Sequence, residues 1–102
     1  MEVAFGEDDL QELENNPDAK SQLSKLVIKA YRERMRCIRD AFNEHDLICM
    51  KSFGFKKLQG GKKNHYSLSL IDGWYLIIRL DMKENGNVIQ ILEIQEKRKR
   101  TN

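Results

Sequence analysis

Hydrophobic residues recur every three or four positions between Leu23 and Ala41, a spacing typical of an amphipathic α-helix. The pattern predicts one long helix over about residues 17–44, roughly 40 Å in length, with Asn16 as its N-cap and Pro17 in its first turn. We expect one side of this helix to pack against a core. The apolar stripe contains Leu23, Leu26, Val27, Ala30, Tyr31, Met35, Cys37, Ile38, Ala41 and Phe42, and the opposite side carries Lys25, Lys29, Arg32, Arg36, Arg39 and Asp40.

A shorter apolar pattern precedes the long helix. Asp8 or Asp9 is expected to cap a short helix that carries Leu10 and Leu13. The alternating residues Val3–Phe5 predict either a first strand or a simple N-terminal extension. After the long helix no clean period is found until a basic loop rich in lysine, so the intervening residues are expected to form a connection.

Three strands are expected in the second half of the chain. Residues 66–71 alternate between apolar and polar, as a half-exposed strand does. Residues 74–80 are apolar on both faces and predict the central strand, and residues 88–95 predict the last one. Asp72-Gly73 and Asn85-Gly86 are expected to form the two hairpin turns, since both pairs tolerate positive φ.

This order of elements predicts a single α+β domain over residues 1–102. Two helices, the second one long, would pack on a small twisted antiparallel sheet of three to four strands. The long helix is expected to cover the face of the central strand that carries Trp74, Leu76, Ile78 and Leu80. Arg79 then lies on the less covered face.

Composition narrows the class of protein. One third of the 102 residues are charged and 40% are hydrophobic, and no apolar run is long enough to span a bilayer. The first residues lack the pattern of a secretion signal, so we expect a cytoplasmic protein. Cys37 and Cys49 are too few for a disulfide scaffold or a zinc site, and no metal or other cofactor is expected.

The net charge of +2 hides an asymmetry. Residues 1–20 contain seven acidic and one basic side chain, whereas residues 21–102 contain nine acidic and seventeen basic ones. A basic body of this kind can attract phosphate backbones or an acidic protein partner. The alternative is a solubilising surface whose asymmetry has no function.

The candidate chemistry lies in clustered bases, because the familiar phosphate-loop, dinucleotide, zinc-protease and serine-hydrolase motifs are absent. Such bases can bind RNA phosphates and stabilise the charge of a phosphorane-like transition state, and Tyr66 and Tyr75 could stack on bases. For Arg79 the alternative is a plain ion pair with Asp81, two residues along the same face. The clustered bases are Lys56, Lys57, Lys62, Lys63 and His65 before the sheet, Arg79 on the central strand, and Lys97, Arg98, Lys99 and Arg100 after the last strand.

In order and spacing, the chain resembles the RelE/ParE superfamily of type II toxin–antitoxin toxins, and within it the HigB (plasmid maintenance killer) branch. The resemblance rests on the short helix followed by the long one, on residues 55–61 (FKKLQGG), on residues 66–78 (YSLSLIDGWYLII) and on residues 94–100 (IQEKRKR). Together these stretches cover nearly the whole chain.

The resemblance implies a toxin that enters the ribosome and cleaves mRNA, with a 2′-hydroxyl as nucleophile. It also implies an antitoxin partner, expected to be a helix-turn-helix protein, and contact with operator DNA only through the toxin–antitoxin complex. Arg98 matches the catalytic arginine of the RelE ending. Lys57, Arg79 and His65 are the other candidate catalytic residues, with His65 the candidate proton carrier. The candidate RNA-binding residues are Lys56, Lys62, Lys63, Lys97, Arg100, Tyr66 and Tyr75.

The chain also departs from the family pattern. Ser67 and Ser69 stand where RelE-type toxins have lysines, and Tyr75 stands where an arginine usually follows the strand tryptophan. Because neither family catalytic set is complete, two alternatives stay open: a non-enzymatic ParE-like toxin that inhibits DNA gyrase, and a binding module without catalysis. In a catalytic protein, Glu93 or Glu96 could replace His65 as the base.

Overall fold

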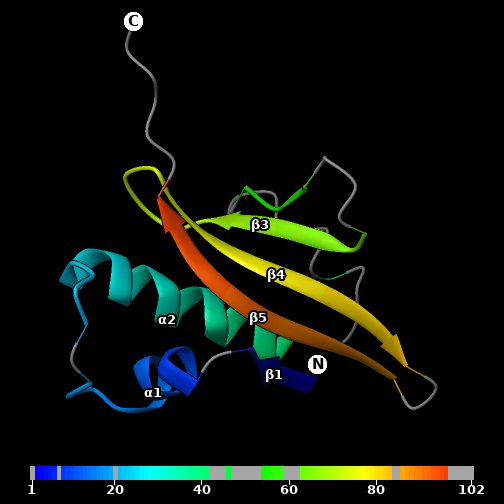
Figure 1. Cartoon of the computed structure of the whole chain (residues 1–102), viewed down its shortest axis with the longest axis horizontal. Helices are drawn as coiled ribbons and strands as arrows, with labels where there is room; N and C mark the ends of the chain where they lie inside the picture. The colour runs from blue at the N-terminus through cyan, green and yellow to red at the C-terminus, as the bar shows by residue number, and fades with distance from the viewer. Residues whose placement is uncertain are drawn as a thin grey trace, which may run out of the picture.

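The computed structural model describes residues 2–6, 8–19, 21–41, 46, 54–58, 63–83 and 86–96. Within them the chain forms strand β1, two helices and then four further strands (Figure 1). The elements are β1 (Glu2–Phe5), α1 (Asp8–Asn15), α2 (Lys25–Asp40), β2 (Lys56–Lys57), β3 (His65–Ser69), β4 (Trp74–Lys83) and β5 (Gly86–Glu96). The expected α+β class is confirmed in this part of the chain.

The sheet is larger than expected and is mixed rather than antiparallel. Its five described strands follow the order β1-β5-β4-β3-β2, and β1 pairs parallel with β5. Val3 lies opposite Ile89 and Phe5 opposite Ile91 in this pair. A three-residue alternation near the start of a chain cannot indicate a partner some 85 residues away, so only the tertiary structure distinguishes a strand from an extension. Strand β2 likewise lies inside the stretch that the sequence predicts as a basic loop.

Strand β4 is the central strand, as predicted, and the turn before it is confirmed. Asp72 and Gly73 both have positive φ, at 51° and 82°. The amide of Trp74 donates to the carbonyl of Ile71 at 2.9 Å, which closes the turn. The second turn differs from the prediction, because Gly86 pairs with Lys83 as the first residue of β5. The two residues between these strands, Glu84 and Asn85, lie outside the described part.

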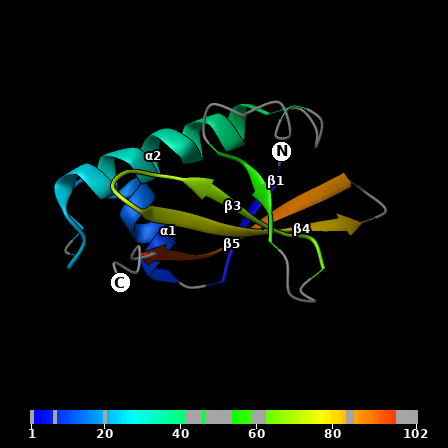
Figure 2. The ribbon, with the colours of Figure 1, turned by 90° about the horizontal axis from the view of Figure 1, so that it is seen from above.

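The core lies between α2 and one face of the sheet (Figure 2). The predicted apolar face of β4 is confirmed, since Leu76, Ile78 and Leu80 are buried there and Trp74 packs against them. From the helices, the buried residues of this core are Leu10, Leu13, Val27, Ala30, Tyr31, Met35 and Ile38.

Helix α2 begins eight residues later than the pattern predicts. Its N-cap is Ser24, whose hydroxyl accepts a hydrogen bond from the Val27 amide at 3.2 Å. Asn16 instead stabilises the turn after α1, where its side-chain oxygen accepts from the Asp18 amide at 2.9 Å. At 16 residues the helix is about 24 Å long. The predicted apolar stripe is also wrong at one position, because the side chain of Leu26 is 59% exposed rather than buried.

Three contacts hold α1 against α2. The buried hydroxyl of Tyr31 donates to the carbonyl of Leu10 at 2.7 Å. Arg32 donates from Nε to the carbonyl of Leu13 at 2.9 Å. Arg39 binds the Glu14 carboxylate through Nε and Nη2 at 2.6 and 2.7 Å. The Arg32 bond satisfies the carbonyl of Leu13, one of the last four of α1, which a helix leaves without intrahelical partners.

Candidate functional site

No described helix covers the second face of the sheet, which we call the open face. Side chains alternate along a strand, so the register places Tyr75, Ile77, Arg79 and Asp81 of β4 on this face. Their neighbours on β3 are Ser69, Ser67 and His65, and Lys56 of β2 lies opposite Ser67. From β5 come Val88, Gln90, Glu93 and Gln95. Three side chains of this face, Ser67, Ile77 and Val88, are buried. The open face is therefore mainly polar, whereas the helix-covered face is apolar.

Arg79 and Asp81 form an ion pair on the open face, which was the alternative interpretation of this arginine. Nε donates to Oδ1 at 2.8 Å and Nη2 donates to Oδ2 at 3.1 Å. The hydrogen bond and the negative charge of Asp81 raise the pKa of Arg79 above its ordinary value. This two-point contact uses the same donor geometry that a phosphate would take.

His65 lies directly across the ladder from Arg79. Its Nδ1 is 2.8 Å from the carbonyl oxygen of Lys63. A carbonyl only accepts, so this contact places a proton on Nδ1 and leaves Nε2 as the acceptor of the neutral ring. The structure thus brings together one candidate proton acceptor and one cation from the predicted catalytic set.

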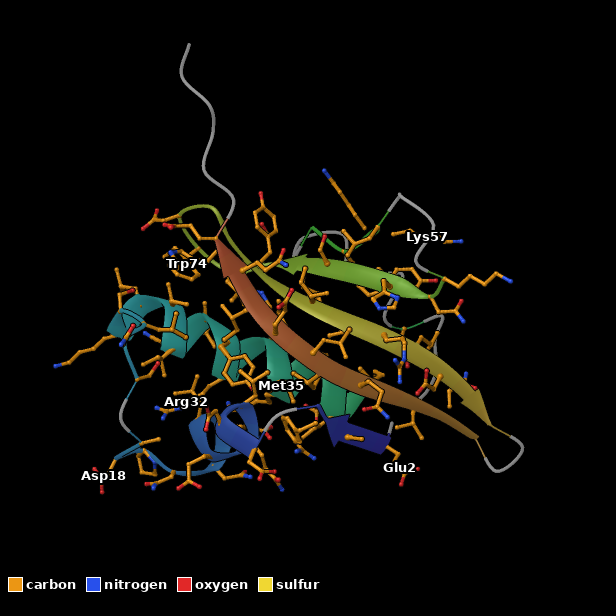
Figure 3. All side chains as sticks on the ribbon, viewed as in Figure 1. Glu2, Asp18, Arg32, Met35, Lys57 and Trp74 are labelled. Carbon is orange, nitrogen blue, oxygen red and sulfur yellow. The ribbon has the colours of Figure 1, made fainter. Side chains whose placement is uncertain are left out.

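The two lysines of β2 lie on different faces. Lys56 is opposite Ser67 on the open face, whereas Lys57 is opposite Tyr66, whose ring belongs to the helix-covered side. Both lysines are exposed, and Figure 3 shows Lys57 at the edge of the sheet, away from the helices. Lys57 therefore does not share a face with His65 and Arg79.

The two candidate stacking tyrosines also lie on different faces of the sheet. Tyr66 stacks on Phe55 with ring centroids 4.9 Å apart and an angle of 15° between the planes, and both rings pack against the core. Tyr75 is half-buried on the open face, opposite Ser69. Of the two, Tyr75 is the one placed to meet a ligand on that face.

Four predicted residues, Lys62, Lys97, Arg98 and Arg100, lie outside the described residues. Lys63 is exposed in the turn that leads into β3. Of the predicted site residues that the structure describes, four lie on the open face: Lys56, His65, Tyr75 and Arg79.

The predicted set of site residues did not include Ser67 and Gln90. Ser67 is only 4% exposed between Lys56 and Ile77, and Gln90 lies opposite Arg79. In the sequence, Gln90 is a lone polar residue between Ile89 and Ile91. Its place opposite Arg79 can be recognised only from the register of β4 and β5. A one-residue error there moves every side chain of β5 to the other face.

The fold and the open face define a small α+β protein with a mixed sheet and one polar sheet face. Within the described residues no group of three or more histidine, cysteine, aspartate and glutamate side chains is arranged to hold a metal ion. No helix of that part is both long and apolar enough to cross a membrane. No protein-family model matches the chain, and no curated protein matches it.

Proposed function

We propose that this protein is the toxin of a type II toxin–antitoxin module, a ribosome-dependent endoribonuclease that binds mRNA on the open face. The observation that carries the proposal is the pairing of His65 with Arg79 across the ladder, on a sheet face that no described helix covers. The order of the sequence motifs supplies the link to the RelE-like toxins.

The open face suits single-stranded RNA. Its polar side chains can bind phosphates and sugar hydroxyls, and Tyr75 offers an aromatic ring to a base. Lys56 adds a positive charge at the β2 edge of this face.

The chemistry needs one base and one cation. In the proposed reaction the substrate 2′-hydroxyl gives its proton to Nε2 of His65, and its oxygen forms a new bond to the adjacent phosphorus. The bond from phosphorus to the 5′-oxygen breaks, which yields a 2′,3′-cyclic phosphate and a 5′-hydroxyl that takes its proton from water. Arg79 stabilises the charge on the phosphoryl oxygens when it exchanges Asp81 for the phosphate.

The test is induced expression followed by mapping of mRNA 5′ ends. We expect growth arrest with cuts aligned to codons, lost in His65→Ala and strongly reduced in Arg79→Gln. Arg79→Lys is the matched control for charge, and it should retain part of the activity because a lysine cannot form the two-point contact. Circular dichroism checks that each variant folds.

Two outcomes would contradict the proposal. Lys57→Gln removes a cation from the other side of the sheet, so a loss as large as that of Arg79→Gln would place the chemistry at the β2 edge. Growth arrest with intact transcripts and DNA-damage signalling would indicate the gyrase-directed alternative. The antitoxin remains part of the proposal, and co-expression of a neighbouring helix-turn-helix protein should relieve the arrest.

A further inference from the structure

A groove of about 970 Å³ runs between α2 and the described residues 17–19 and 21–23. Its helix side is formed by the α2 surface that points away from the sheet, including Lys25, Lys29 and Arg36. The opposite wall includes Pro17, Ala19 and Leu23. The groove therefore shares no residue with the open face, and it does not depend on the proposed function.

Hydrogen bonds fix the wall of this groove in place. Arg32 donates from Nη2 to the carbonyl of Asn16 at 3.1 Å, which ties the start of the segment to α2. The Ala19 amide donates to the same carbonyl at 3.0 Å. At the other end the Leu23 amide donates to the Ser21 hydroxyl at 3.1 Å, next to the N-cap Ser24. Because the Arg32 bond ties one end of this wall to α2, that part of the groove is formed before a partner binds, which lowers the entropic cost of binding.

The groove combines a basic rim with an apolar floor. Lys25, Lys29 and Arg36 are exposed, and Glu33 is the acidic residue among the groove-lining side chains of the described part. Leu23 and Ile28 form the apolar floor: both are half-buried and pack against the core. Leu26, which is exposed one turn before Lys29 on the same helix, is not among the groove-lining residues.

A second groove, of about 910 Å³, lies on the other side of the same segment and has the opposite charge. Among the described residues its lining includes Asp9, Glu12, Asp18 and Glu93 and no lysine or arginine. An acidic ligand would be repelled there and attracted to the basic groove, so the pair of grooves defines where such a ligand can lie.

We propose that the basic groove binds an acidic amphipathic helix of a protein partner. The rim from Lys25 to Arg36 spans eleven residue steps, about 16 Å, which matches roughly three turns of a partner helix. Acidic side chains of that helix would meet Lys25, Lys29 and Arg36, and its leucines would cover Leu23 and Ile28. The apolar floor and Glu33 favour a peptide over RNA, whose phosphates offer nothing apolar and would be repelled by that carboxylate.

The test uses the full chain and a synthetic helical peptide of twelve residues. The peptide places leucines at positions 2, 5 and 9 and glutamates on the flanks, and a control peptide has the same composition in scrambled order. We expect the helical peptide to bind at least tenfold more tightly than the control by fluorescence anisotropy. In the ¹⁵N-labelled protein, amide shifts should concentrate on residues 19–36.

Variants locate the site. Lys29→Glu with Arg36→Glu should weaken peptide binding at least tenfold, whereas Lys29→Arg with Arg36→Lys keeps both charges and should bind like the unmodified protein. Lys63→Glu reverses one charge in the turn before β3 and should have less than a twofold effect. Equal loss in Lys63→Glu, shifts outside the groove, equal affinity for the scrambled peptide, or tighter binding there of a twelve-nucleotide RNA would each overturn the proposal.

Discussion

Arg79 and Asp81 hold each other through two hydrogen bonds, of 2.8 and 3.1 Å, on the sheet face that the two helices leave open. The two residues are neighbours on this face because strand side chains alternate. A phosphate group can replace a carboxylate in this geometry, so Asp81 would compete for Arg79 with the RNA of the proposed function.

Asp81→Asn should therefore raise the affinity for single-stranded RNA, because it removes the charge that holds Arg79. We expect a rise of about threefold or more for a twelve-nucleotide RNA in a filter-binding or anisotropy assay at low salt. Glu93→Gln is the matched control, since it removes one negative charge from the same face opposite Ile77. An equal rise in both variants would mean that net charge alone is responsible.

Tyr31 should make the protein sensitive to alkaline pH. Burial, and then the negative charge of Glu14, raise the pKa of its hydroxyl well above the ordinary value, and the positive charge of Arg39 opposes them. The unfolded chain ionises at about pH 10 and the folded one does not, so this contribution is complete below pH 10 and is lost as the pH rises further, by about 1.4 kcal/mol per pH unit.

Tyr31→Phe isolates that effect. At pH 7 the variant should be less stable by about 1 kcal/mol, because the hydrogen bond to the Leu10 carbonyl is lost. Urea unfolding at pH 7, 10 and 11 should show this difference shrinking and then reversing sign above pH 10. A constant difference across the series would contradict the prediction.

The pair of Arg39 and Glu14 should be a stabilising link between the helices. The Glu14 side chain is 10% exposed and that of Arg39 is 45% exposed, and Phe5 lies 6.0 Å from the Arg39 guanidinium carbon. A double-mutant cycle with Arg39→Met and Glu14→Gln should give a coupling energy of up to about 1 kcal/mol that decreases in 1 M salt.

The two single variants should differ. Arg39→Met leaves a largely buried carboxylate without this partner, so it should cost more than Glu14→Gln. Glu33 lies 3.8 Å from Arg34 and is exposed, and Glu33→Gln is expected to have little effect. Equal costs for all three substitutions would mean that the link between Arg39 and Glu14 is an ordinary surface pair.

A side chain at Gly54 should destabilise the fold. Its φ is +64°, and a Cβ at this position would lie 3.1 Å from the Cβ of Ser69. Gly54→Ala should therefore lower the free energy of unfolding by about 1–2 kcal/mol. At Gly6 the nearest atom to an added Cβ is 3.5 Å away and no positive φ is required, so Gly6→Ala is the control, with a change close to zero in thermal or urea unfolding.

Local patterns in the sequence determined the elements whose cause is local. The alternation of β3, the apolar β4 and the positive φ at Asp72 and Gly73 follow from side-chain type and turn chemistry. Part of the candidate site follows from the same rule, since Arg79 and Asp81 share a face wherever residues 74–83 form a strand. The apolar stripe predicted α2, but it could not show where the helix begins, because Ser24 caps it in preference to Asn16.

Only the tertiary structure decided which of these elements meet. The parallel pairing of Val3 with Ile89 joins residues at opposite ends of the sequence, and no local preference specifies it. The same holds for His65 across from Arg79, since it depends on the register of two strands. It also holds for the separation of Lys56 from Lys57, because one position along a strand reverses the face. The sequence thus determines which charged and aromatic side chains the protein has, whereas the tertiary structure determines which of them share the open face or line the basic groove.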